Sequence, residues 1–449
     1  MILNSDLIRA EVLNQEFHLL NSGAIKDWLL NQDLLSQRDI EVTIYSSESF
    51  IKERDTGFDG TAIHFYSPSA SINELYTIFR GSEHREVSDW RPKDWVYNLL
   101  GIFTGLGKTQ YEAARAFNEE VTNHILNQTI PPLRKIGMGF SLGGNLVQTL
   151  QLIEAPFEIV FTYNDAKPSV YQLAYIDTTF QHEIELHTNQ VLDPFSLIYQ
   201  IPIEGLEKLA HRIYPTEKEF IYKLNVNSDL LYAFHIVPGF MDVGHECLLR
   251  VRKGQRLREV LEDIPPTFFR TIREGLATYS LLYETEGFDA LWEEITGLDA
   301  KTIEAIFRSI VDYREDGFHP GLLKEWWKIY THLFGSMDEL YNRLPLFTTL
   351  LSRVWEHAPT FLRLLMSNNY LTVEEYKQWN ESLTVIRGHM GGDLDHGILE
   401  QDLWLSLLTS FRLLKKVMIL LFEDVVAGVQ AHDLDSLIYY IRKYDKIFL

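Results

Sequence analysis

The sequence contains a single cysteine, Cys247, and it lacks any apolar run near the roughly 18 residues of a membrane-spanning helix. One cysteine excludes an internal disulfide framework, and it fits both a reducing compartment and many secreted bacterial proteins. Because no long apolar run is present, we expect no transmembrane segment. The first residues show neither a basic start nor an apolar stretch ending in small residues, so we expect no signal peptide. The protein is then either cytoplasmic or exported by a leaderless route.

Positive charge is also scarce. The chain has 41 Lys and Arg against 63 Asp and Glu, which gives a formal net charge of −22. Nucleic-acid backbones bind through Lys and Arg, so we expect no nucleic-acid partner. The same balance disfavours passive adsorption to anionic lipid. A lipid substrate would have to be engaged through apolar surface or through a targeted partner.

The chain of 449 residues exceeds what one hydrophobic core usually organises, so we expect two domains. Short β-rich runs alternate with helical segments in the first part, which predicts an α/β domain over 1–255. The stretch 178–215 is too long for a simple connection and predicts a helical insertion. Apolar positions at helical spacing predict an all-helical domain over 256–449. The expected strands cover 61–66, 74–79, 133–140, 157–163 and 219–226, and the expected helices cover 108–127 and 143–154.

Two features of the second domain are specific enough to test. Thr372 and Glu375 have the spacing of a capping box, which predicts the start of a helix. The segment 403–425 is densely apolar and predicts a buried central helix, although Lys415 and Lys416 interrupt it.

A Gly-x-Ser-x-Gly motif, Gly139-Phe140-Ser141-Leu142-Gly143, stands where a strand should end and a helix should begin. Such a turn holds the serine in a strained conformation, and the glycines leave room for neighbouring backbone. The serine then projects near a helix N-terminus, where backbone N–H groups favour developing negative charge. The alternative interpretation is a turn with a helix-capping serine. The strand before the motif and the apolar helical face after it favour Ser141 as a nucleophile.

Together with other short motifs, this serine turn resembles the class 3 lipases. The matching residues, in chain order, are Phe79–Ser82, Asp94-Trp95 with Asn98-Leu99, Gly105–Ala113 and Gly139–Gly144. The run Thr162–Pro168, with Gly57-Phe58, is similar to the bacterial Mbeg1-like branch of these hydrolases. The resemblance spans roughly residues 55–250. One departure is Phe140, since the family usually has histidine before the serine.

The resemblance implies an α/β-hydrolase fold with a Ser-His-Asp triad. Backbone N–H groups of Ser82 and Leu142 would form the oxyanion hole. The acid and base should follow the serine in that order, and the best matches are Asp229 and His245. Rivals remain open: His235 as the base, and Asp177, Asp193 and Asp242 as the acid. Cys247 beside His245 is expected to be a buried structural cysteine, because no nucleophile turn surrounds it.

The implied activity is hydrolysis of lipid carboxylic esters, of the phospholipase A or acylglycerol lipase type, with no cofactor and no metal. The segment 83–106 stands where class 3 lipases carry a lid, and an ordinary packed helix is the alternative. The layout also resembles bacterial lipase toxins whose LXG-like helical half directs leaderless secretion. A targeting or immunity protein would then be a partner of the helical domain. A second hypothesis is a catalytically silent hydrolase fold that binds partners through this domain.

Overall fold

A computed structural model describes most of the chain, which divides into two compact units. The first unit contains Met1–Lys223, Gly239–Glu246 and Ile272–Leu350, and the second contains Leu224–Pro238, Cys247–Thr271 and Leu351–Leu449. The units interleave along the chain, whereas the sequence predicted one division after residue 255. The described residues are 1–19, 22–31, 39–51, 56–81, 97–127, 132–193, 195–214, 220–251, 256–296, 358–390 and 399–448.

The sheet has seven strands, which lie in the order in which they occur in the sequence. Neighbours among β1, β2 and β3 pair antiparallel, whereas β3, β4 and β5 pair parallel, so the sheet is mixed. It confirms an α/β part with all five predicted strands, and adds β1 and β7. The strands are β1 (Glu41–Ser46), β2 (Gly60–Ser67), β3 (Ile72–Phe79), β4 (Arg134–Phe140), β5 (Ile159–Tyr163), β6 (Ile221–Val226) and β7 (His245–Leu249).

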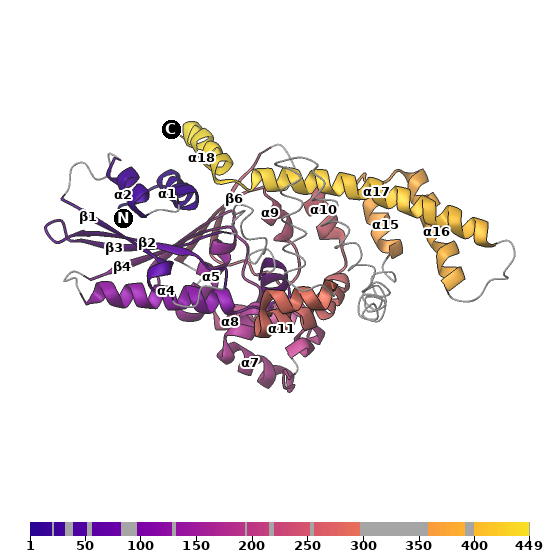
Figure 1. The fold of residues 1–449 in the computed structure, drawn as a ribbon, viewed down its shortest axis with the longest axis horizontal. Coiled ribbons are helices and arrows are strands. Elements are labelled where there is room, and N and C mark those ends of the chain that lie inside the picture. Colours follow the sequence, from indigo (N-terminus) through magenta and orange to yellow (C-terminus); the bar gives the residue numbers. More distant parts are fainter. Residues whose placement is uncertain are drawn as a thin grey trace, which may run out of the picture. The chain divides into compact units, whose positions relative to one another are not determined.

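Helices cover both faces of the strands of the first unit (Figure 1). On one face lie α4 (Thr109–Leu126) and α5 (Leu142–Glu154), both predicted from the sequence. Their apolar residues form one core with Leu75 and Phe79 of β3. On the other face lie α1 (Asp6–Leu19) and α2 (Ser22–Leu30). Side chains alternate between the faces of a strand, so each face presents its own apolar set to its helices.

Short helices occupy the region after β5. The stretch 178–215 contains α7 (Thr178–Thr188), the 3-10 helix η3 (Phe195–Gln200) and α8 (Ile203–Ile213), with α6 (Val170–Ile176) before it. Further helices are the π-helix η2 (Tyr97–Phe103), α9 (Leu230–Phe234), α10 (Arg256–Asp263) and α11 (Pro266–Thr296). Helix α11 is interrupted at Gly287, whose φ of 85° is not helical.

The C-terminal part is helical, with α15 (Ala358–Ser367), α16 (Val373–Met390), α17 (Leu399–Ala431) and α18 (Leu434–Phe448). The predicted capping box is confirmed, because Thr372 and Glu375 exchange hydrogen bonds between side chain and backbone N–H at 2.9 and 3.2 Å. Among the described residues, no helix is both long and apolar enough to cross a membrane.

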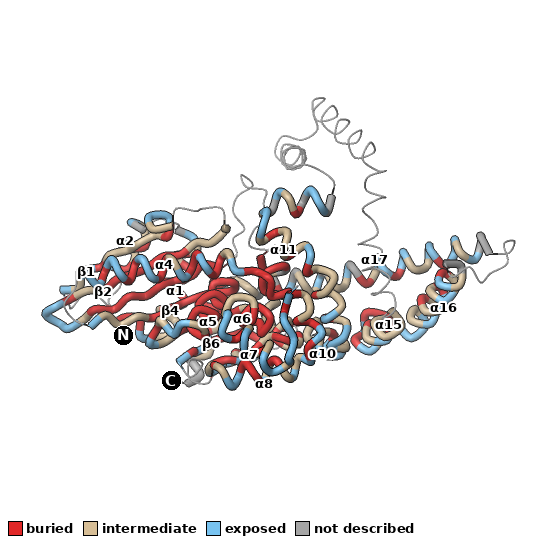
Figure 2. Tube along the Cα trace, turned by 90° about the horizontal axis from the view of Figure 1, so that it is seen from below, coloured by how far each residue is buried: buried red, intermediate tan, exposed pale blue. Residues whose placement is uncertain are grey.

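The sequence predicts a buried central helix over 403–425; the helix is present, but the prediction that it is buried is wrong. Helix α17 covers the segment, but many of its residues are exposed (Figure 2). Apolar density predicts burial only where other elements supply a covering surface. The exposed apolar residues are Trp404, Leu405, Leu407, Leu408, Phe411, Leu414 and Ile419.

Candidate active site

Ser141 lies at the turn between β4 and α5 and has a backbone conformation that L-residues rarely adopt. Its φ is 56° and its ψ is −123°. For a non-glycine residue this conformation is strained, and strain of this kind concentrates at functional sites. The side chain accepts no capping hydrogen bond from the helix, so the structure does not support the interpretation of Ser141 as an ordinary helix-capping serine.

The glycines of the turn are required by close backbone packing. A Cβ on Gly143 would lie 1.9 Å from the Phe79 carbonyl oxygen, and a Cβ on Gly139 would lie 2.3 Å from the Gly143 carbonyl oxygen. Real Cβ atoms do not approach backbone so closely, so no larger residue fits at either position. The turn is therefore pressed against the end of β3.

The residues that follow β3 lie directly beside the serine. A Cβ on Gly81 would be 3.1 Å from Ser141 Cβ and 2.9 Å from the Phe140 carbonyl oxygen. Leu142 is the first residue of α5, and the first N–H groups of a helix have no acceptor within it. An anion at Ser141 would thus face the positive end of the α5 dipole. Ser82, the other predicted oxyanion donor, lies outside the described residues.

The segment after β5 holds the serine turn from the other side. The Ser141 N–H donates to the Tyr163 carbonyl at 3.2 Å, and the Ala166 N–H donates to the Ser141 carbonyl at 3.1 Å. Asn145 donates through Nδ2 to the Lys167 carbonyl at 3.0 Å. These bonds give a structural reason for the run Thr162–Pro168, whose role the sequence alone did not indicate.

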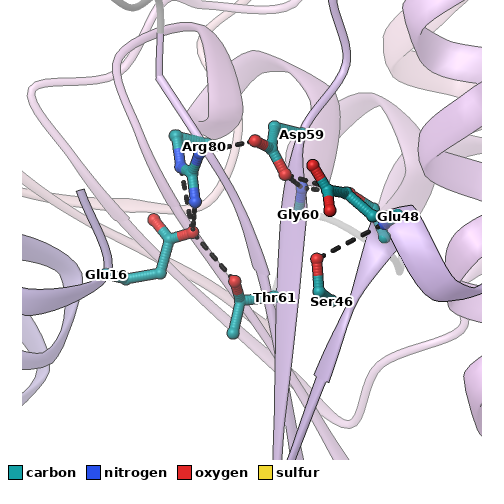
Figure 3. A network of polar contacts seen from close by, with 8 residues as sticks. Glu16, Ser46, Glu48, Asp59, Gly60, Thr61 and Arg80 are labelled. Carbon is teal, nitrogen blue, oxygen red and sulfur yellow. Dashed lines mark hydrogen bonds and ion pairs between the residues drawn. The ribbon is translucent and has the colours of Figure 1, made fainter. Parts of the chain in front are cut away.

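A buried ion network fixes the end of β3 (Figure 3). The Arg80 guanidinium donates to Glu16 Oε1 at 2.6 and 3.0 Å and to Asp59 Oδ2 at 2.5 Å. The Arg80 N–H also donates to the Asp59 carbonyl at 3.1 Å. Arg80 immediately precedes Gly81, so the network positions the backbone that faces Ser141.

Glu16 is the most buried member of this network, with 1% of the residue exposed. Thr61 Oγ1 donates a further hydrogen bond to its carboxylate at 2.9 Å. Burial raises the pKa of Glu16, and the Arg80 charge opposes that rise. The sequence did not indicate this residue, because the N-terminal helix shows no motif that distinguishes Glu16 from a surface glutamate.

Asp229 follows β6, as the sequence predicted, and lies in the second unit. It is 2% exposed and caps helix α9, with Oδ1 accepting from the N–H groups of Leu231 at 2.7 Å and Tyr232 at 3.4 Å. Its Oδ2 lies 2.6 Å from Nδ1 of His432. The structure therefore pairs the predicted acid with a histidine that was not among the predicted bases.

His245, the predicted base, is the first residue of β7 and is exposed. Its ring packs against that of Tyr222, with a centroid distance of 5.4 Å. The rival His235 is buried and contacts the ring of Tyr232. Cys247 is exposed, so the prediction of a buried cysteine is wrong. It stands on the strand β7, whose residues 245–247 are all exposed.

Two of the rival acids have structural contacts of their own. Asp177 caps α7 and accepts a hydrogen bond from the Tyr214 hydroxyl at 2.6 Å. Asp242 is exposed and forms ion pairs with Lys167 and Lys223. The third rival, Asp193, is exposed. These contacts join neither Asp177 nor Asp242 to a histidine, whereas Asp229 contacts His432.

His432 lies far beyond residue 250, where the family resemblance ends, so the resemblance did not point to it. One weak sequence signal could have drawn attention to it: it lies in the short link between two long apolar-rich helices, next to Asp433. Asp433 caps α18 through a 3.1 Å bond from the Ser436 N–H. Only the fold brings residues 229 and 432 together.

Two other features bear on substrate access. A cleft of about 600 Å³ is lined by residues at the amino ends of β4 and β5, including Arg134 and Ile159. Ser141 follows the carboxyl end of β4, so this cleft is at the opposite end of the strand. Within the predicted lid, 83–96 lies outside the described residues, and Tyr97, Leu100 and Ile102 of η2 are buried. The lid stays a prediction.

Comparisons with known proteins give a family but no activity. The family model described as "Domain of unknown function (DUF6792)" matches residues 7–250. The uncharacterized protein YvcB of Bacillus subtilis (strain 168) is 25% identical over 373 residues, which are 79% of this chain and 54% of that relative. The chain thus spans about half the length of that relative. No solved structure matches.

Proposed function

The chain belongs to the DUF6792 family, and we propose that it is a serine hydrolase that cleaves carboxylic esters of lipids. The observation that carries the proposal is the conformation of Ser141, with φ of 56° at the turn from a parallel strand to a helix. This is the arrangement of the nucleophile in an α/β-hydrolase fold. The close packing of Gly81 and Gly143 around the turn supports the same interpretation.

In the proposed reaction, Ser141 Oγ attacks the ester carbonyl carbon while a general base takes its proton. The negative charge on the carbonyl oxygen is stabilised by the N–H groups of Leu142 and Ser82, which would contribute on the order of a few kcal/mol. Collapse releases the alcohol and leaves an acyl-enzyme, which water then hydrolyses. Asp229 is the acid that orients the base. The scheme requires no cofactor and no metal.

The proposed substrate is a lipid ester, of the phospholipase A or acylglycerol type. A net charge of −22 disfavours attraction to an anionic surface, so apolar contacts would have to engage the acyl chain. Export by a leaderless route, as an antibacterial lipase toxin, belongs to the same proposal. The exposed apolar residues of α17 support a protein partner for the helical part, of the targeting or immunity type.

A fluorophosphonate probe tests the nucleophile directly. We expect the full chain to be labelled and Ser141→Ala to lose the label. Ser71→Ala is the matched control, because Ser71 is also a serine with positive φ, 54°, but lies in the turn between β2 and β3. It should label like the unaltered protein. No labelling of folded protein, with detergent or lipid present, would contradict the proposal.

The substrate class needs a separate measurement. Mixed bilayers incubated with the unaltered protein and with Ser141→Ala would be compared by lipid mass spectrometry. We expect lysolipid or free fatty acid only with the unaltered protein. If labelling succeeds and neither product appears, a soluble ester or a peptide replaces the lipid.

A second candidate is a catalytically silent hydrolase fold that acts as a binding protein. Two observations favour it: Phe140 replaces the usual histidine of the resembling family, and α17 exposes apolar residues that a partner could cover. This candidate predicts a folded protein that the probe does not label. The labelling experiment therefore separates the two candidates.

A further inference from the structure

The buried arginines of the first unit differ in what their guanidinium groups contact. Among its described residues, Arg9, Arg80 and Arg273 are buried. Arg9 pairs with Asp6 at 2.8 Å, and Arg80 pairs with Glu16 at 2.6 Å. A buried charge is tolerated when an opposite charge or hydrogen bonds compensate it. Arg273 is the exception, because no carboxylate in the described part of the chain forms an ion pair with it.

The Arg273 guanidinium, on the helix α11, lies against two aromatic rings. Its Nε donates to the Phe103 carbonyl at 2.7 Å, and its Cζ lies 4.7 Å from the centre of the Phe103 ring and 4.9 Å from that of Tyr171. The residue is 1% exposed, and its Nη2 has no hydrogen-bond partner within the described ranges. Buried donors in proteins are rarely left in this state, so an unpaired guanidinium nitrogen indicates a group that is meant to be met by an acceptor.

Glu207 does not supply that acceptor. Its carboxylate accepts a hydrogen bond from the Gly239 N–H at 3.3 Å and attracts Arg273 from a longer distance than an ion pair. Burial lowers the pKa of Arg273, whereas the polar partners of Arg9 outweigh the same effect and raise the pKa of that residue. Arginine keeps its proton in proteins, so Arg273 is a buried cation whose charge the described residues leave uncompensated.

We propose that Arg273 binds the carboxylate of an apolar ligand, such as a free fatty acid. A guanidinium donates strong, charge-assisted hydrogen bonds to a carboxylate. The rings of Phe103 and Tyr171 suit an apolar chain, and Ala277, one turn further along α11, belongs to the hydrophobic core. A phosphate dianion would need more compensation than one guanidinium gives. The site goes beyond the proposed reaction, because binding at Arg273 requires no chemistry at Ser141.

The test follows decanoate binding to the full chain by calorimetry, with decanol and inorganic phosphate as comparison ligands. We expect decanoate to bind at least about tenfold more tightly than either, because only decanoate has both the carboxylate and the apolar chain. Arg273→Met keeps the length of the side chain and removes its charge, so it should weaken decanoate binding at least about tenfold. Arg273→Lys keeps a charge without the planar guanidinium and should bind with intermediate affinity. The buried guanidinium is reached through local opening, so we expect slow association.

Thermal melting separates a binding residue from a structural one. Decanoate should raise the melting temperature of the unaltered protein and not that of Arg273→Met. Arg9→Met is the matched control, because Arg9 is also buried and lies 3.7 Å from the centre of the Phe161 ring, but has its carboxylate partner. Without ligand, we expect Arg9→Met to lower the melting temperature clearly and Arg273→Met to change it little, since the charge removed from Arg273 has no counter-ion.

Each of three results would overturn the proposal. Decanoate that stabilises Arg273→Met as much as the unaltered protein binds elsewhere. Tighter binding of phosphate than of decanoate contradicts a carboxylate ligand. Failure of the unaltered protein to bind decanoate removes the site, and a loss of stability in Arg273→Met as large as in Arg9→Met would then identify Arg273 as structural. None of these results changes the labelling of Ser141, so the proposed function is judged separately.

Discussion

Helices α5 and α17 are both rich in apolar residues, yet the chain uses them differently. Leu150 of α5 is 0% exposed, whereas Leu408 of α17 is 63% exposed. Helix α5 packs on the sheet and carries the serine at its start, so nearly every residue of it is buried. Helix α17 buries Leu413 and Val417, but many of its other apolar residues between 404 and 419 are exposed. Similar hydrophobicity in the sequence is therefore buried in one region and partly exposed in the other.

Ion pairs of this chain also differ in burial, and the pair of Glu16 with Arg80 is the buried case. Replacing Glu16 by glutamine removes one carboxylate from Arg80, and breaking a buried ion pair costs about 3–5 kcal/mol. We expect a loss of this size in urea unfolding followed by circular dichroism. The same change should also weaken fluorophosphonate labelling, because Arg80 positions Gly81 beside Ser141.

Glu119→Gln is the matched control for Glu16→Gln. Glu119 pairs with Arg115 at 3.8 Å, and both side chains are about half exposed. Exposed pairs contribute roughly 0–1 kcal/mol. Equal unfolding midpoints for Glu16→Gln and Glu119→Gln would mean that the network at the end of β3 does not support the fold.

The same leucine truncation in both helices tests the opening comparison directly. Leu150→Ala removes a fully buried side chain and should cost about 2–5 kcal/mol. Leu408→Ala removes an exposed one and should change stability by less than about 0.5 kcal/mol. Each is measured as the shift of the urea midpoint. A large loss in Leu408→Ala would mean that α17 is covered in solution, and light scattering would then show whether a second copy covers it.

The features that could be predicted from the sequence are those set by residues close together in the chain. Patterns of neighbouring residues predict the strands, the helices α4 and α5, the turn at Ser141 and the capping box at Thr372. The capping box needs only residues 372 and 375, and both of its bonds are present.

What the sequence could not predict depends on contacts between distant residues. Glu16 reaches Arg80 across 64 positions, and His432 reaches Asp229 across 203. Neither has a spacing that a pattern could detect. His245 is predicted as the base from its position after the acid loop and its resemblance to the family's final histidine, and neither feature carries a signal for the contact of Asp229 with His432. The predicted burial of α17 is wrong for a similar reason, because burial of a helix depends on other elements that pack against it.

The smallest expected effect concerns the ion pair of the helical region. Lys416 donates to Glu375 at 2.7 Å, and this bond, with that from the Thr372 N–H, holds the pKa of Glu375 below its ordinary value. A carboxylate with a lowered folded pKa stabilises the fold above its unfolded pKa, and this stabilisation is lost as pH falls through the folded pKa.

Glu375→Gln should therefore cost about 0.2–1 kcal/mol at pH 7, as expected for a partly exposed pair. Glutamine keeps the capping-box contact with Thr372 and does not titrate. The difference in melting temperature between the two proteins should shrink as pH falls below the ordinary glutamate value of about 4.3. If the difference instead persists into strong acid, the contribution of Glu375 comes from packing on α17 and not from its charge, and the contrast with the buried Glu16 no longer rests on ionisation.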